Sequence, residues 1–95
     1  MKVQIEFLGL PTVAKIVGVA QKIEFGGGTI GDLIAHLIKR YGAGVEQVLV
    51  DNEKKLNPYI LVVINEELIA GRDDREHHQL SEGDNITFTI MAEGG

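Results

Sequence analysis

The chain has 95 residues, enough for a single domain, and its 44% hydrophobic and 24% charged composition is that of a globular protein. The net charge of -5 disfavours nucleic acid and anionic membranes as partners. The absence of cysteine excludes disulfides, thiolate-bound metal sites and a cysteine nucleophile. The N-terminus has no apolar signal region, and the longest apolar run, Tyr59 to Ile64, is too short to span a bilayer. We therefore expect a cytoplasmic protein.

The first two elements are predicted to be strands. Residues 2–8 alternate, with Val3, Ile5 and Phe7 on one side, which is the period of a strand with one buried face. Residues 18–25 alternate more loosely, with Val19, Ile23 and Phe25 in step. A connection through Gly9 and Pro11 would join the two strands as a hairpin.

The third element is predicted to be an amphipathic helix. Its apolar stripe has the spacing of one helix face and consists of Ile30, Leu33, Ile34, Leu37, Ile38 and Tyr41. Thr29 is a suitable N-cap, Asp32 completes a shortened capping box, and Lys39 and Arg40 suit the last turn. Gly42 suits the left-handed position that follows a helix.

The second half of the chain alternates between turns and strands. Residues 45–50, "VEQVLV", fit a short helical turn or a short strand. Residues 59–64 form an unbroken apolar run typical of a central strand, and residues 68–70 form a strand stub. A polar loop, residues 71–84, precedes the last strand, in which Ile86, Phe88 and Ile90 alternate with Thr87, Thr89 and Met91.

The order of these elements predicts an α+β fold. If the last strand runs parallel beside the first, the helix lies in a right-handed crossover and its stripe packs on Val3, Ile5, Phe7, Ile86, Phe88 and Ile90. That arrangement is the β-grasp, a mixed sheet of four to five strands on one main helix. We expect the domain to occupy residues 1–91 and a flexible tail to occupy residues 92–95.

Three other motifs are weaker candidates for a site. "GGGTIGD" lacks the Lys and Ser or Thr of a phosphate-binding loop, so it indicates a strand-to-helix turn that needs positive φ. "DDREHH" gathers Asp73, Asp74, Glu76, His77 and His78 without metal-ligand spacing, so we expect no metal there. His36 lies off the helix stripe and is expected on the solvated face.

The final residues are the strongest candidate. The strand pattern is followed by Ala92, Glu93, Gly94 and Gly95, which when extended reach about 13–14 Å from the domain. Because glycine has no Cβ, Gly94 and Gly95 can enter a channel that would exclude other residues.

This β-grasp pattern with a Gly-Gly end resembles the ubiquitin-like sulfur carriers of the MoaD/ThiS type, most of all the small subunit of molybdopterin synthase. The likeness spans the chain and includes the capped helix, "YILVVINEELI", "LSEGD" and the final "GG". It implies a co-substrate rather than an enzyme, with no bound cofactor. An activating enzyme of the MoeB/ThiF type would use ATP to adenylate Gly95, which then becomes a thiocarboxylate, while Gly94 passes through the partner's channel.

The resemblance also implies a docking surface beside the tail. We expect it on the sheet face away from the helix, formed by Leu61, Val63, Thr87, Thr89, Met91, Ala92 and Glu93. The alternative is that the segment from Gly44 to Leu56 covers part of this stripe.

The recipient of the sulfur is less narrowly defined. The length favours molybdopterin synthesis, with a MoaE-like large synthase subunit as the second partner. Other sulfur carriers serve thiamine synthesis, tRNA thiolation or amino-acid synthesis. Two further alternatives are a protein modifier conjugated through Gly95 and a non-covalent β-grasp binding module.

Overall fold

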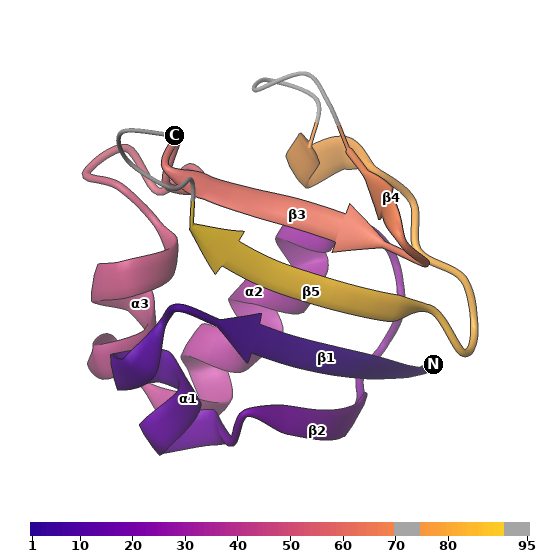
Figure 1. Ribbon diagram of the computed structural model, residues 1–95, viewed down its shortest axis with the longest axis horizontal. Coiled ribbons are helices and arrows are strands. Elements are labelled where there is room, and N and C mark those ends of the chain that lie inside the picture. The colour runs from indigo at the N-terminus through magenta and orange to yellow at the C-terminus, as the bar shows by residue number, and fades with distance from the viewer. Residues whose placement is uncertain (70–74, 91–95) are drawn as a thin grey trace.

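A five-stranded mixed sheet with helices on one face makes up the computed structural model, which describes residues 1–69 and 75–90 (Figure 1). The strand order is β2-β1-β5-β3-β4. The elements, in chain order, are β1 (Lys2–Leu8), α1 (Pro11–Val17), β2 (Ala20–Glu24), α2 (Ile30–Tyr41), α3 (Ala43–Leu49), β3 (Ile60–Ile64), β4 (Glu67–Leu68), the 3-10 helix η1 (Arg75–His77) and β5 (Asn85–Ile90).

The predicted topology is confirmed. β1 runs parallel to β5, with Phe7 opposite Phe88, and β3 runs antiparallel to β5 on its other side. β5 is therefore the central strand, and α2 lies in the connection that crosses from β2 to the far half of the sheet (Figure 1). The predicted pairing of β1 with β2 is also antiparallel.

The core lies between the sheet and α2, as predicted. Ile30, Leu33, Ile34 and Leu37 are buried against the inward residues of β1 and β5. At the centre the rings of Phe7 and Phe88 stack with centroids 5.5 Å apart. The prediction for Ile90 was wrong, because its side chain is 46% exposed. Ile90 ends its strand beside Gly9, which has no side chain to cover it.

The cap of α2 forms as predicted. The hydroxyl of Thr29 accepts from the backbone N–H of Asp32 at 3.2 Å, and the Asp32 carboxylate accepts from the Thr29 N–H at 2.9 Å. At the other end Gly42 has φ of 88°, which suits glycine, but its ψ of -157° is not the left-handed helical value that we predicted. Gly42 instead turns the chain directly into α3.

Helix α1 was not predicted. Pro11 stands in its first turn, and Val13 and Val17, one helical turn apart, are buried. β1 and β2 therefore pair across a helical connection rather than a hairpin turn. The inward position predicted for Val19 was wrong, because Val19 precedes β2 and is exposed.

Residues 45–50 were predicted to form a helical turn or a short strand, and they lie mostly in helix α3, with Val45 and Leu49 in the core.

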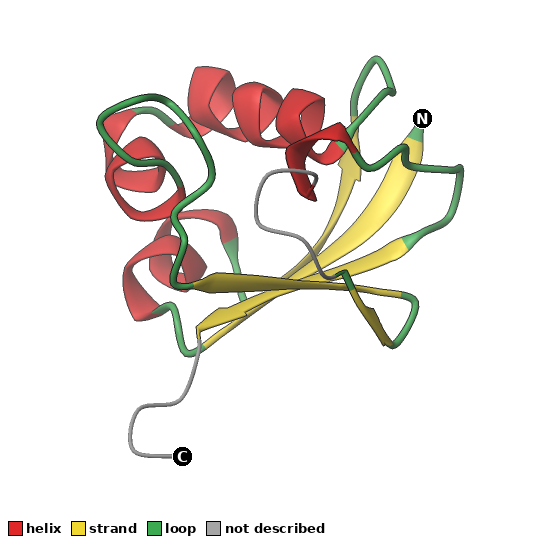
Figure 2. Ribbon diagram, turned by 90° about the horizontal axis from the view of Figure 1, so that it is seen from above, coloured by secondary structure: helices red, strands yellow, loops and turns green. Residues whose placement is uncertain are grey.

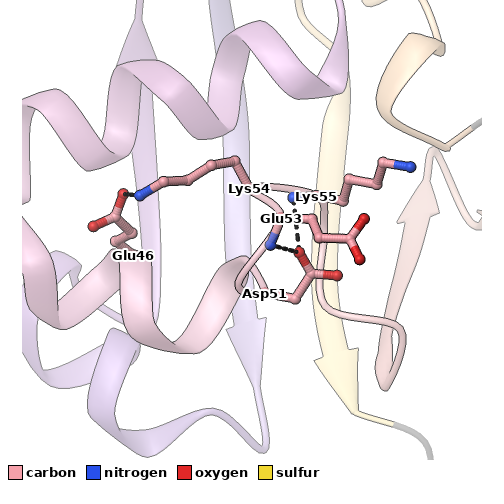
Figure 3. Close-up of polar contacts among 5 residues, drawn as sticks. All are labelled: Glu46, Asp51, Glu53, Lys54 and Lys55. Atoms are coloured by element: carbon pink, nitrogen blue, oxygen red, sulfur yellow. Dashed lines mark hydrogen bonds and ion pairs between the residues drawn. The ribbon is translucent and has the colours of Figure 1, made fainter.

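A tight turn then leads to β3. The Asp51 carboxylate accepts from the backbone N–H groups of Glu53 and Lys55 at 2.8 and 3.0 Å, and the Lys54 ammonium pairs with Glu46 at 2.9 Å (Figure 3). This turn lies on the helix side, since Lys54 lines a groove with residues of α2.

The strands of the second half lie close to their predicted places. β3 begins at Ile60, and β4 is a two-residue edge strand one residue earlier than expected. The predicted polar loop contains η1, where Arg75 is only 5% exposed and donates to the backbone carbonyls of Ile60 and Asn57. Of the helices that the structure describes, none has the length and apolar character required to cross a bilayer.

Candidate functional site

The sheet face away from the helices carries the described part of the predicted docking surface. Leu61 lies opposite Thr89 and Val63 lies opposite Thr87 in the register of β3 and β5. All four side chains are half-buried and adjoin one another, so they form one continuous patch, which we call the open-face patch. Of the predicted surface, Met91, Ala92 and Glu93 lie outside the described residues, as do Gly94 and Gly95 of the tail.

The segment from Gly44 to Leu56 does not cover this patch. Helix α3 contacts α1 and α2, and Val45, Leu49 and Leu56 point into the core between the layers. Figure 2 shows the three helices together on one side of the sheet. The open-face patch is therefore accessible as far as the described residues are concerned.

Two further apolar residues of this face were missed from the sequence. Leu8 lies opposite Thr89 on the β1 side and is 45% exposed, and Leu68 lies opposite Val63 on the β4 side and is exposed. Leu8 is out of step with Val3, Ile5 and Phe7, which places it on the outward face of β1. Leu8 could have been found from the sequence, because it is an apolar residue at a position of the strand where the alternation otherwise places polar residues.

The position of β5 determines where the tail begins. Because β1 and β5 are parallel, their last residues, Leu8 and Ile90, lie at the same end of the sheet. The antiparallel strand β3 starts at that end. Met91 to Gly95 follow Ile90 in the sequence. The last described residues of the central strand thus lie next to Leu8 and Leu61.

The glycine-rich turn has no room for an anion. Gly27 and Gly28 have φ of 90° and 121°, which confirms a strand-to-helix turn that requires glycine. The Asp32 carboxylate fills the start of α2, so close to Gly28 that a Cβ there would lie 2.1 Å from it. The N-terminal dipole of α2 is thus already occupied by a side chain of the protein itself.

Among the residues that the structure describes, the histidines belong to no cluster of metal ligands. Glu76 accepts a hydrogen bond from the Leu56 N–H at 3.0 Å, His77 is exposed, and Asp73 and Asp74 lie outside the described residues. Within residues 1–69 and 75–90 there is no group of three or more side chains suited to a metal ion.

The prediction of a solvated His36 was only partly right, because the residue is half-buried. Its Nε2 is buried without a hydrogen-bond partner among the described residues, and its ring lies 5.9 Å from that of Phe25. Phe25 follows β2 and extends the layer that packs on α2, so the buried side of the helix is wider than its aliphatic stripe.

Comparison with solved structures confirms the fold of the protein. The crystal structure of small archaeal modifier protein 1 (SAMP1) from Haloferax volcanii matches with a TM-score of 0.76 and 18% identity over 100% of both chains. A structure of the BexX/CysO complex from Amycolatopsis orientalis matches at 0.68 and 27% identity, over 98% of this chain and 99% of that one. A putative molybdopterin converting factor subunit 1 from Pyrococcus furiosus matches at 0.67 and 18% identity, over 97% and 99%. The fold is the β-grasp of ubiquitin-like proteins, as predicted.

A match to a family model shows the family to which the chain belongs. The profile of the ThiS family matches residues 12–95, so the chain belongs to the ThiS family of ubiquitin-like sulfur carriers. The match runs through Gly94 and Gly95. Small carriers of this type are generally substrates of other enzymes rather than catalysts. A search of curated proteins found no match to the chain.

Proposed function

We propose that this protein carries sulfur as a thiocarboxylate on Gly95. The observation that supports the proposal most is the position of β5. This strand is central and well packed up to Phe88, and the family match continues from it through both glycines. A rigid domain that leads directly into a short tail of small residues can present a reactive end to an enzyme without taking part in the chemistry.

The chemistry requires activation by a partner. A carboxylate is a poor acyl donor because its leaving group would be oxide. An adenylating enzyme of the MoeB/ThiF type would join the Gly95 carboxylate to the α-phosphate of ATP and release pyrophosphate. A sulfide equivalent would then attack the acyl carbon and displace AMP, which leaves the thiocarboxylate. The domain itself supplies the docking surface and the reach of the tail.

We place the sulfur in molybdopterin synthesis, with a MoaE-like large subunit as the recipient. Two features support this assignment: the resemblance of the sequence to the synthase small subunit, and the match to the Pyrococcus furiosus protein over nearly the whole of both chains.

A protein modifier is the second candidate, because an activated Gly95 can also acylate a lysine amine. The match to the Haloferax volcanii modifier supports this alternative. Isopeptide-linked adducts in cell extracts would distinguish the modifier from the carrier.

The first step can be measured directly. With the cognate adenylating enzyme, ATP and Mg²⁺, the protein is expected to stimulate exchange of labelled pyrophosphate into ATP. The variant that lacks Gly95 should give no stimulation although its domain is intact, as judged by circular dichroism. Equal exchange with and without Gly95 would rule out that residue as the point of activation.

Docking on the open-face patch gives a second expectation. Leu61→Lys should weaken binding to the adenylating enzyme about tenfold, because it places a charge at the centre of an apolar contact. The free energy of unfolding should change by less than about 1 kcal/mol, since Leu61 faces outward. Titration calorimetry and urea unfolding measure the two effects.

Val19→Lys is the matched control for Leu61→Lys. Val19 is also apolar and is more exposed than the half-buried Leu61, but it adjoins Pro11 and Lys15 on the helix side. If both variants weakened binding equally, the effect would come from charge alone and the patch would not be the docking surface.

A further inference from the structure

The open face of the sheet is hollowed by a groove at the end opposite the tail. Its volume is about 510 Å³, and its lining comes from β1, β2, β3, β5 and the turn between β3 and β4. Ala20, Val63 and Thr87 are among the lining residues, and Glu6 and Glu66 contribute carboxylates. Glu6, Thr87 and Val63 lie side by side in the register, so the groove adjoins the open-face patch.

The charged residues that line this groove are all acidic. Its lining residues include neither lysine nor arginine. Within the part of the chain that the structure describes, neither Glu6 nor Glu66 forms an ion pair. Lys22 lies opposite Gln4 on the edge strand β2 and is exposed, but it does not line the groove. Two carboxylates that form no ion pair among the described residues, next to apolar surface, attract a cation that has an apolar stem.

The groove is preformed. Asn65 fixes the turn that carries Glu66 to β5 through two hydrogen bonds with Asn85. The Asn65 backbone N–H donates to the Asn85 carbonyl at 2.8 Å, and the Asn65 side-chain oxygen accepts from the Asn85 N–H at 2.9 Å. The Asn65 amide also donates to the Asp84 carboxylate at 2.9 Å. A partner would therefore not have to order this turn, which lowers the cost of binding.

We propose that this groove receives an arginine side chain of the enzyme that activates Gly95. The guanidinium would lie between Glu6 and Glu66, and its methylene stem would pack on Ala20 and Val63. Thr87 lies three residues before the end of β5, so this anchor is about 10 Å from the start of the tail. Together with the open-face patch, it would fix the rotation of the carrier on the enzyme and direct the tail toward the active site. The identity of the partner rests on the proposed function.

The groove can be tested without the partner. N-acetyl-arginine amide at millimolar concentration is expected to shift the NMR signals of Val63 and Thr87, and N-acetyl-citrulline amide, its neutral isostere, is not. The shifts should disappear in the Glu6→Gln/Glu66→Gln variant. Equal shifts with the two amides, or unchanged shifts in the variant, would overturn the proposal.

Glu66→Gly separates binding from folding. Glu66 has φ of 71°, a conformation that glycine adopts more easily, so this variant should be at least as stable to heat as the parent. Its response to N-acetyl-arginine amide should nevertheless be several-fold weaker, because one carboxylate is gone. A stable variant with an undiminished response would contradict the role of Glu66.

The full chain and its cognate adenylating enzyme provide the second test. Glu6→Gln/Glu66→Gln is expected to raise KM for the carrier about tenfold or more with little change in kcat. Glu53→Gln changes a single exposed charge on the helix side and should alter KM less than about twofold (Figure 3). If the parent is active and the double variant behaves like this control, the groove proposal fails. If the parent itself is not activated, the proposed function fails instead.

Discussion

Replacing Phe88 by alanine is expected to destabilise the domain by about 3–5 kcal/mol. Phe88 is fully buried at the centre of β5, and its ring stacks on Phe7 at 5.5 Å. The substitution removes a large apolar surface and leaves a cavity between the sheet and α2. Because domains of this size have a total stability of about 5–15 kcal/mol, the loss would be a large fraction of it. Urea unfolding followed by circular dichroism measures the change.

Ile90→Ala is the matched control for Phe88→Ala. Ile90 belongs to the same strand and the same face, but it is 46% exposed, so its loss should cost about 1 kcal/mol or less. Equal destabilisation by the two substitutions would show that the core does not centre on the Phe7–Phe88 pair. Since β5 directly precedes the tail in sequence, the Phe88 variant should also no longer be adenylated by the partner enzyme at temperatures at which the variant unfolds.

Replacing Gly94 by valine is expected to lower the rate of activation roughly 100-fold or more, the range in which misplacement of a reacting group falls. The added side chain would widen a tail that, under the proposed function, enters a narrow channel of the partner, and its branched Cβ would restrict the backbone. Domain stability should not change, because Gly94 follows the last described strand. Single-turnover formation of the adenylate, measured at saturating carrier, separates this effect from weaker binding.

Gly26→Val is the control for the Gly94 substitution. A Cβ at Gly26 would meet no atom within 4 Å apart from Gly26 itself and the two adjacent residues, so we expect the domain to tolerate a side chain there. This variant should be activated at the rate of the parent. A normal rate for Gly94→Val would remove the channel argument, and a slow rate for both variants would point to a general loss of activity instead.

The parts of the fold that were predicted correctly have local signals that agree with their tertiary environment. Helix α2 has a cap, a stripe and favourable end charges, all formed by residues near one another in sequence. Helix α1 was missed because it has only seven residues, and its β-branched Thr12, Val13, Ile16 and Val17 have modest helix propensity. Packing of Val13 and Val17 into the core stabilises this helix, and such long-range contacts are not visible in a short window.

The same distinction applies to the site. Leu61, Val63, Thr87 and Thr89 were expected on one face of the sheet, and the register of β3 and β5 places them side by side there. Their role in docking stays a prediction. The groove needed Glu6 of the first strand and Glu66 of a turn to lie at one face, and the spacing of the two in sequence gives no indication of this. The buried Nε2 of His36 was missed for a related reason, since the ring of His36 contacts Phe25, which belongs to a different part of the chain.

The central claim is that Gly95 carries sulfur, and the intact mass of the protein tests it most directly. After incubation with the cognate adenylating enzyme, ATP and a sulfur donor, the mass should rise by the difference between sulfur and oxygen. Fragmentation should place the change on Gly95. An unchanged mass with an enzyme that has been shown to adenylate the chain, or a sulfur found on any other residue, would contradict the account.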